Sequence, residues 1–388
     1  MATSDEFFGE RSPQAILKHG LLARYAHYFA GRAGRATAGK VLFLDGYAGE
    51  GRYADGSPGS PLLLASQAER AKLFGREVQL VLVEPDDARR RRLARTLEEN
   101  EIRVGRIIGS PFEVASQSLL DEYPEHAALV FVDPFGLAFS REALERTLRL
   151  SSPRRPVDVL YHFSLSTVAR MGRAAATDAP GAAQMRQQLD AALGDINWAA
   201  LFDGAGAPGD ATRAAIQLAG EFSASVAATS NGRSTAIPVR QRPNQFPKYM
   251  LTLFSRDERA HWDFADVASS AYVDWLHHCD TSDYEANLER ERSYGMLSLF
   301  EPEAPARASI DEVLAEEAQS YLRDHLLTRL AESPGFRPMD DIAGFYGAML
   351  GRARSKHGRA ALKAMHAEGL VTDDASGEYW RRRLYRSH

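Results

Sequence analysis

Short, continuous apolar runs alternate with segments of helical periodicity along most of the chain. Apolar runs that end in polar or turn residues are typical of strands buried in a parallel sheet. Because the stretches between the runs favour helices, the pattern predicts an α/β fold with a doubly wound, Rossmann-like sheet. The predicted strands lie at residues 40–44, 78–83, 102–108, 127–132, 157–163 and 248–254.

Changes in composition divide the chain further. Residues 170–236 are rich in Ala and Gly and predict a helical insertion in a domain that spans residues 1–300. Residues 301–308 contain two prolines among small residues, which is typical of a linker. A second domain is then predicted at residues 309–388.

This C-terminal domain has the element order of a winged helix. A long amphipathic helix is expected at 309–331, followed by helices at 339–349 and 352–368. Two short runs within 370–386 flank Asp-Asp-Ala-Ser-Gly, which predicts a hairpin.

Charge and cysteine content exclude several classes of protein. The 388 residues contain 47 Lys and Arg against 52 Asp and Glu, so any nucleic-acid contact must come from a local patch. The single cysteine, Cys279, excludes a disulfide framework and a multi-cysteine metal centre, and we predict no metal site. The acidic N-terminus has no apolar segment and no run of about 18 apolar residues exists, so we expect a cytoplasmic protein without membrane association.

The strongest local motif follows the first predicted strand and reads Asp-Gly-Tyr-Ala-Gly-Glu-Gly over residues 45–51. Its glycines let the backbone approach a ligand closely. A pyrophosphate cofactor favours glycines that open directly into a helix, whereas residues 52–57 delay the helix here. The motif therefore disfavours NAD and resembles motif I of class I S-adenosylmethionine-dependent methyltransferases, with a structural glycine turn as the alternative. The candidate cofactor contacts in it are Asp45, Tyr47, Ala48, Gly49 and Gly51.

Further cofactor contacts are expected at the next strand ends. Glu84 follows the second strand, where an acid binds ribose hydroxyls; the alternative is a helix N-cap, which Asp86 could also supply. Lys18 and His19, on a helix before the first strand, are candidates to cover the methionine end of the cofactor, or else form a surface pair. The remaining candidates follow the second and third strands and are Pro85, Ser110, Pro111 and Phe112.

The fourth strand ends in Asp133, Pro134, Phe135 and Gly136. This motif resembles motif IV of amino-methyltransferases, most of all that of tRNA guanine-N2 methyltransferases. The resemblance implies that the Asp and the Pro carbonyl accept hydrogen bonds from an exocyclic amine while the aromatic ring stacks on the base. A strand-end turn is the alternative. His162, at the end of the fifth predicted strand, fits either a base pocket or a core histidine.

Basic residues concentrate near the C-terminus, where residues 352–388 carry a net charge of +5. A recognition helix and wing could hold phosphates there, with Tyr379 and Trp380 as stacking surfaces. Contact with a protein is the alternative. The candidate nucleic-acid contacts are Arg352, Arg354, Lys356, Arg359, Arg381, Arg382 and Arg383.

Taken over residues 14–388, the chain resembles the bacterial three-Cys-motif partner proteins. The segments that carry the resemblance are residues 18–25, 45–53, 56–58, 83–84, 131–136 and 246–249, together with the C-terminal winged helix. The resemblance implies a class I methyltransferase-like domain, S-adenosylmethionine as cofactor, and a radical-SAM-like partner protein with three cysteines. It does not imply a defined substrate.

We therefore predict a methyltransferase that acts on a nitrogen of a DNA or RNA base. Two alternatives stay open: a non-catalytic or cofactor-binding partner protein, and a winged-helix regulator that binds nucleic acid. An NAD-dependent oxidoreductase is disfavoured, because no catalytic His, Lys and Tyr set is apparent near the strand ends.

Overall fold

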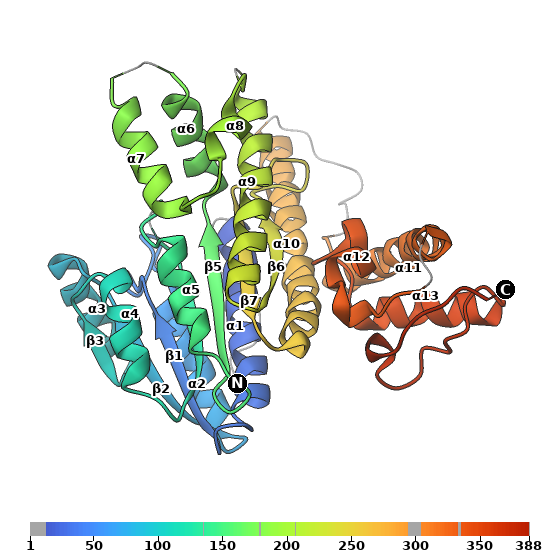
Figure 1. Ribbon diagram of the computed structural model, residues 1–388, viewed down its shortest axis with the longest axis horizontal. Helices are drawn as coiled ribbons and strands as arrows, with labels where there is room; N and C mark the ends of the chain where they lie inside the picture. Colours follow the sequence, from blue (N-terminus) through green and yellow to red (C-terminus); the bar gives the residue numbers. More distant parts are fainter. Residues whose placement is uncertain are drawn as a thin grey trace. The chain divides into compact units, whose positions relative to one another are not determined.

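The computed structural model describes residues 13–134, 136–177, 180–205, 207–293, 304–332 and 335–387. Contacts divide these residues into two units, one made of residues 22–261 and the other of residues 13–21 and 262–387. Two long helices, α1 (Pro13–Ala33) and α10 (Glu258–Ser293), contribute residues to both units (Figure 1). No helix among the described residues is both long and apolar enough to span a membrane.

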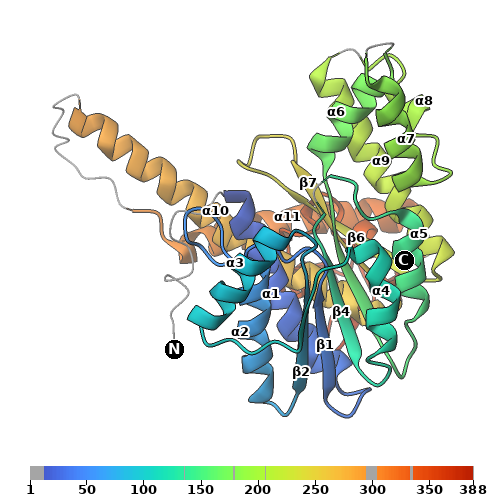
Figure 2. The ribbon, with the colours of Figure 1, turned by 90° about the vertical axis from the view of Figure 1, so that its left-hand side faces the viewer.

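The 22–261 unit contains a seven-stranded mixed sheet with the order β3-β2-β1-β4-β5-β7-β6 (Figure 2). The first five strands in sequence pair in parallel, whereas β7 is antiparallel to both of its neighbours. The strands are β1 (Lys40–Asp45), β2 (Glu77–Val83), β3 (Arg106–Ile108), β4 (Ala127–Val132), β5 (Val157–Phe163), β6 (Arg233–Val239) and β7 (Tyr249–Ser255).

Most of the predicted strands are confirmed, with two differences. Strand β3 is shorter than predicted, because the N–H of Ile102 bonds back to the carbonyl of Leu97 and pairing with β2 begins only at Arg106. Strand β6 was missed. It is an edge strand with buried residues only at alternate positions, so it has no continuous apolar run.

Helices cover both faces of the sheet, which explains why its central strand β4 is apolar throughout. Helices α2 (Ser60–Lys72) and α3 (Asp87–Glu99) lie on one face, and α4 (Phe112–Asp121) and α5 (Arg141–Arg149) lie on the other (Figure 2). All six residues of β4 are buried. The core on the α4 side includes Phe112, Phe139 and Leu144.

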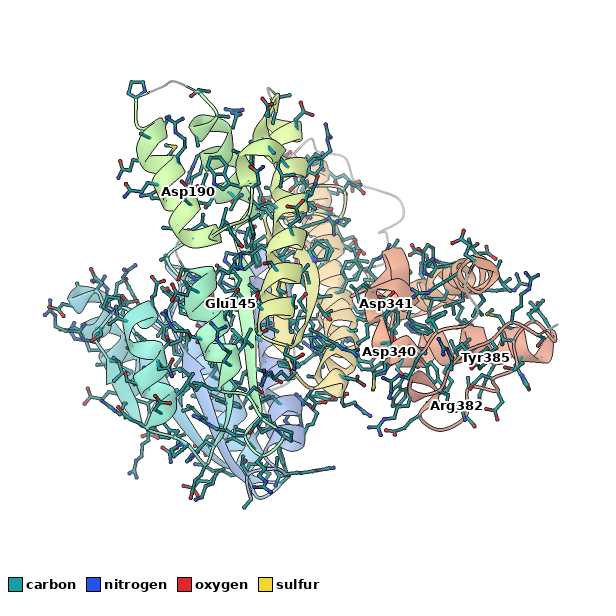
Figure 3. The ribbon with its side chains drawn as sticks, in the orientation of Figure 1. Glu145, Asp190, Asp340, Asp341, Arg382 and Tyr385 are labelled. Atoms are coloured by element: carbon teal, nitrogen blue, oxygen red, sulfur yellow. The ribbon has the colours of Figure 1, made fainter. Side chains whose placement is uncertain are left out.

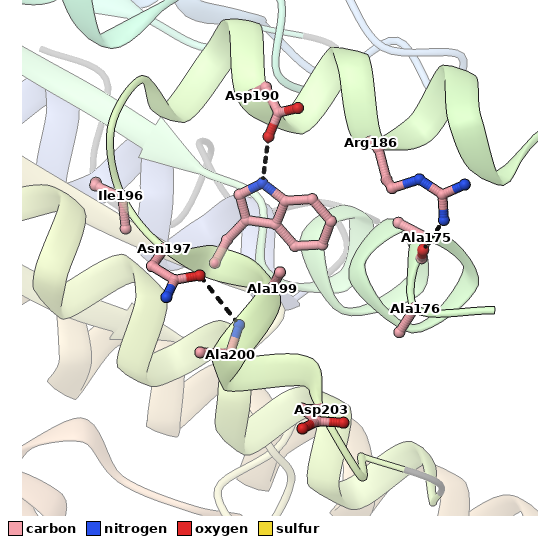
Figure 4. A pocket seen from close by; sticks show the side chains of 10 residues that line it. Ala175, Ala176, Arg186, Asp190, Ile196, Asn197, Ala199, Ala200 and Asp203 are labelled. Atoms are coloured by element: carbon pink, nitrogen blue, oxygen red, sulfur yellow. Dashed lines mark hydrogen bonds between the residues drawn. The ribbon is translucent and has the colours of Figure 1, made fainter.

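Four helices follow β5: α6 (Leu165–Ala175), α7 (Ala182–Leu193), α8 (Trp198–Phe202) and α9 (Pro208–Thr229). A cavity of about 610 Å³ lies among α6, α7 and α8, with alanines and Trp198 in its wall (Figure 4). The indole N–H of Trp198 donates to Asp190 over 2.8 Å. The helical stretch ends at Thr229, and β6 begins four residues later.

The second unit is mainly helical. Its elements after α10 are α11 (Arg307–Glu332), η2 (Pro338–Asp340), α12 (Ile342–Tyr346), η3 (Gly347–Met349), α13 (Ser355–Ala367) and η4 (Tyr379–Arg381), where η denotes a 3₁₀ helix. The helix predicted at 339–349 is thus broken into three short turns. In place of a regular hairpin, two isolated antiparallel bridges lie in the described part of this unit, Phe336 with Leu384 and Val371 with Arg386.

Candidate functional site

The glycine-rich loop after β1 crosses the carboxyl ends of the neighbouring strands. The N–H of Gly46 donates to the carbonyl of Phe131 in β4, and the N–H of Ala48 donates to the carbonyl of Val83 in β2, each over 2.9 Å. Within the loop, the N–H of Tyr47 donates to Asp45 over 3.2 Å. The loop therefore ties the ends of β2, β1 and β4 together at one edge of the sheet.

Three predicted site acids follow these three strands. Asp45 is the last residue of β1, Glu84 comes directly after β2, and Asp133 comes directly after β4. Because the strands are adjacent and parallel, the acids lie along the same edge, where ligands of open α/β sheets bind.

Glu84 is held by the backbone of the loop. Its carboxylate accepts the N–H of Gly49 over 3.0 Å and that of Asp86 over 2.9 Å, and Arg89 lies 3.3 Å away. Asp86, and not Glu84, is the N-cap of α3, because its side chain accepts the N–H of Arg89 over 2.8 Å. A carboxylate has about four acceptor positions, so Glu84 can accept further hydrogen bonds from a ligand.

Gly49 and Gly46 need to be glycine for different reasons. Gly49 has a φ of +62°, and a Cβ placed on it would meet nothing within 4 Å, so the loop is open on that side. A Cβ on Gly46 would lie 2.5 Å from the ring of Phe112. Helix α2 begins only at Ser60, so the glycine loop does not open directly into a helix N-terminus.

The loop rests on a cluster of aromatic side chains. The hydroxyl of Tyr47 donates to the carbonyl of Ala138 over 3.1 Å, and burial, together with the charge of Glu113, raises the pKa of this tyrosine. Phe112 stacks on Phe139 at 5.1 Å and meets Tyr47 edge-on. Phe112 is therefore a buried support for the loop, whereas the other candidates nearby are exposed: Pro85, Ser110 and Pro111.

His162 is a site residue that the sequence left open. Its Nδ1 lies 3.1 Å from Oδ1 of Asp133, and its ring meets that of Tyr249 edge-on at 4.1 Å. Strand β5 places His162 beside the end of β4, and the antiparallel β7 brings Tyr249 to the same edge. A polar residue near the end of a buried strand indicated a possible site residue. Its pairing with Asp133 could not be predicted, because it depends on β5 lying beside β4 in the sheet.

The rest of the acceptor motif extends from this edge. Pro134 is buried, and Phe135 lies outside the described residues. Residues 136–138 line a cavity of about 400 Å³, together with Glu113, Met171 of α6 and Gln188 of α7. The motif thus borders a space large enough for a small organic group.

Lys18 and His19 lie in α1 and belong to the second unit. Lys18 is partly exposed and His19 is buried. Their contact with a cofactor stays a prediction.

The seven candidate basic residues near the C-terminus each contact another group of the same unit. Arg352 contacts Glu317 at 2.7 Å, whereas Arg354 and Lys356 share Asp311. The remaining pairs are Arg359 with the carbonyls of Ala375 and Gly377, Arg381 with Glu378, Arg382 (labelled in Figure 3) with Asp373, and Arg383 with the carbonyl of Gly335.

The expectation that Tyr379 and Trp380 offer stacking surfaces is wrong. Tyr379 is fully buried and Trp380 is 8% exposed. Trp380 stacks on Trp262 at 5.4 Å, and both pack in a core with Phe345 and Leu362. Hydrophobic burial in a small helical unit has placed these rings inside.

Comparison with known proteins adds little to this geometry. No protein-family model matches the chain, and no curated protein matches it. One similar solved structure is the plantazolicin methyltransferase BamL in complex with a triazolic desmethylPZN analog and SAH. It has 11% sequence identity and a TM-score of 0.29, covering 64% of this chain and 86% of that one. A TM-score of this size does not establish a shared fold.

Proposed function

We propose that this protein is an S-adenosylmethionine-dependent methyltransferase that acts on an exocyclic amine of a nucleic-acid base. The observation that carries the proposal is the alignment of Asp45, Glu84 and Asp133 along one edge of the sheet, joined by the glycine loop.

The residues of this edge fit the cofactor. Glu84 would accept the ribose hydroxyls, since its carboxylate is already oriented by two backbone N–H groups. The open side of Gly49 leaves space for a nucleoside beside the backbone. When bound, S-adenosylmethionine supplies an electrophilic methyl group without any phosphate, which agrees with a loop that does not enter a helix directly.

Asp133 would receive the acceptor amine. Its carboxylate, 3.1 Å from His162, can accept an N–H of that amine, which orients the nitrogen lone pair for attack. The carbonyl of Pro134 is the second acceptor that the motif implies. These groups position the amine.

We also propose that residues 309–388 form a winged-helix domain. Along the chain, α11, Phe336, α12 and α13 are followed by Val371 and Leu384. This order supports a winged helix, because the bridges at Phe336 with Leu384 and at Val371 lie where the strands of a minimal wing would pair. A radical-SAM-like protein with three cysteines remains the proposed protein partner, and the cytoplasm the proposed location.

Calorimetric titration with S-adenosylhomocysteine tests the cofactor site, and transfer of labelled methyl groups to total RNA and to DNA tests the reaction. We expect heat of binding and labelled nucleic acid. Asp133→Ala should abolish transfer and leave cofactor binding intact, whereas Asp121→Ala, an exposed change on α4, should alter neither. Absence of heat from folded protein would refute the methyltransferase. Binding without transfer would favour the cofactor-binding partner protein.

A further inference from the structure

We propose that single-stranded RNA docks on a surface formed by the exposed side of α6 and the loop between β6 and β7. This inference rests on the proposed function and names the substrate of the same site. The surface, called here the α6–loop surface, is defined by Arg170, Arg173, Phe246 and Lys248.

The two segments of this surface are joined beside the acceptor site. The N–H of Ser166 in α6 donates to the carbonyl of Lys248 over 3.1 Å. Lys248 is followed by Tyr249, whose ring contacts His162, the residue that pairs with Asp133. A polyanion on this surface would therefore lie next to the residues that hold the acceptor amine.

The exposed residues of α6 form a basic stripe. Ser166, Arg170 and Arg173 follow the i, i+4, i+7 spacing of one helix face, and all three are exposed. The stripe starts at the contact with Lys248 and continues along the helix, so successive cations follow one line as a phosphate backbone requires.

The charged residues of the two segments are all basic. Helix α6 and residues 239–249 contain no Asp or Glu. Their five basic residues are Arg170, Arg173, Arg240, Arg242 and Lys248. Phosphates arriving here would meet no like charge from these segments, in contrast to those arriving at Arg354 or Arg382, which contact carboxylates.

The loop also offers a ring and a hollow for bases. Phe246 is 50% exposed, and it lies between Gln245 and the buried Pro247, which restricts the backbone at this point. A cavity of about 480 Å³ is lined by Arg240, Asn244, Gln245 and Phe246 among others. An exposed ring beside amide and guanidinium groups suits an unstacked base, which stacks on the ring and bonds to the polar groups.

We choose RNA because the acceptor amine must leave its base stack to reach Asp133. Loops and single strands of RNA present such bases, whereas duplex DNA must first be opened at a cost of a few kcal/mol. Duplex nucleic acid would also leave the ring of Phe246 without a stacking partner.

Fluorescence anisotropy with a labelled, unstructured RNA of about 12 nucleotides tests the surface over a range of salt concentrations. The substitutions Arg170→Gln, Arg173→Gln and Lys248→Gln, combined, should weaken binding at least about 10-fold and reduce the salt slope by about 2. Phe246→Ala should weaken binding about 10-fold with an unchanged slope. All four residues are exposed, so folding should be unaffected; thermal melting checks this.

The comparison variant removes three charges from the C-terminal unit, Arg354→Gln, Lys356→Gln and Arg381→Gln. It should change the affinity less than about twofold, since these cations are already paired. The inference is overturned if this variant weakens binding as much as the α6–loop variant, if the latter binds normally, or if the wild type does not bind. Equal binding of a DNA strand of the same sequence would overturn the choice of RNA. Calorimetry with S-adenosylhomocysteine on the same samples separates these failures from failure of the cofactor site.

Discussion

The start of α13 and helix α6 are both basic, but they differ in the acidic residues that accompany their cations. Arg354 and Lys356 at the start of α13 share the carboxylate of Asp311, whereas α6 carries two arginines and no acid. The C-terminal segment is the more basic of the two by count. A count of basic residues therefore does not measure the positive charge that is available to a ligand, because neighbouring acids neutralise part of it.

The aromatic residues of the two regions differ in the same way. Trp380 is packed against Trp262 in the core of its unit, whereas Phe246 exposes half of its surface on a loop. Only the exposed ring can stack on a base without unfolding the protein. Substitutions at Trp380 and at Arg354 with Lys356 test this contrast directly.

Trp380→Ala should destabilise the C-terminal unit by about 3 kcal/mol or more, since it leaves a cavity beside Trp262, Phe345 and Tyr379. Denaturant unfolding measures the loss. Phe246→Ala is the matched control and should change stability by no more than about 0.5 kcal/mol. A Trp380→Ala variant that keeps its stability but loses RNA binding would show that the ring is a stacking surface after all.

Acid should destabilise both units, because each contains a buried histidine whose pKa is lowered to about 4 by burial: His261 in one and His357 in the other. In the unfolded chain these groups titrate near 6.5. Between the two values the unfolded state binds more protons, so stability is complete above about pH 6.5 and falls as the pH drops towards 4.

Denaturant unfolding at pH 7 and pH 5 should show a loss of about 2 kcal/mol for His261 and a smaller loss for His357, because solvent screens the charges of Lys356 and Arg354 beside His357. His261→Gln and His357→Gln test the two histidines separately. Each variant should lose the part of the pH dependence of stability that comes from its own histidine and keep the other part. The ring of His261 lies 3.0 Å from the hydroxyl of Thr235 and 3.2 Å from the carbonyl of Ser255, so its variant should also be less stable at pH 7. An unchanged pH dependence in both variants would contradict the prediction.

Glu84→Gln should reduce the affinity for S-adenosylhomocysteine about 30-fold, because it weakens hydrogen bonds to a buried carboxylate. Calorimetry measures the change. The matched control is Asp87→Asn, three residues after Glu84. Asp87 is exposed and pairs with Arg90 at the surface, so this variant should bind S-adenosylhomocysteine normally. Equal affinity of the two variants for S-adenosylhomocysteine would show that the ribose does not bind at the end of β2.

Arg354→Gln with Lys356→Gln should lower the free energy of unfolding by about 1 kcal/mol, because Lys356 is exposed and the pair of Arg354 with Asp311 is only partly buried. Although burial opposes it, hydrogen bonds from Lys356 and Arg354 hold the pKa of Asp311 below its ordinary value. The double variant should therefore raise this pKa, which a carboxylate titration followed by NMR would detect. An unchanged pKa of Asp311 would show that these cations are free in solution and available to a ligand.

The local pattern of the sequence determined the central strands and the edge on which the candidate site lies. Strand β4 and residues 41–44 of β1 are continuous apolar runs because both faces of the sheet are covered, and the polar residues that follow them stand out for that reason. Parallel strands place their carboxyl ends together, so Asp45 and Asp133 could be assigned to one edge without coordinates. The edge strand β6 is buried only at alternate positions, so the search for continuous apolar runs did not predict it.

Only the tertiary structure decided which side chains meet. The partner of Asp133 is His162, 29 positions along the chain, and the ring against His162 comes from Tyr249 on a reversed strand. The pairing of Arg354 with Asp311 and the burial of Trp380 likewise join residues far apart in sequence. Periodicity specifies which face of an element is buried, but pairing depends on long-range packing, which no local pattern encodes.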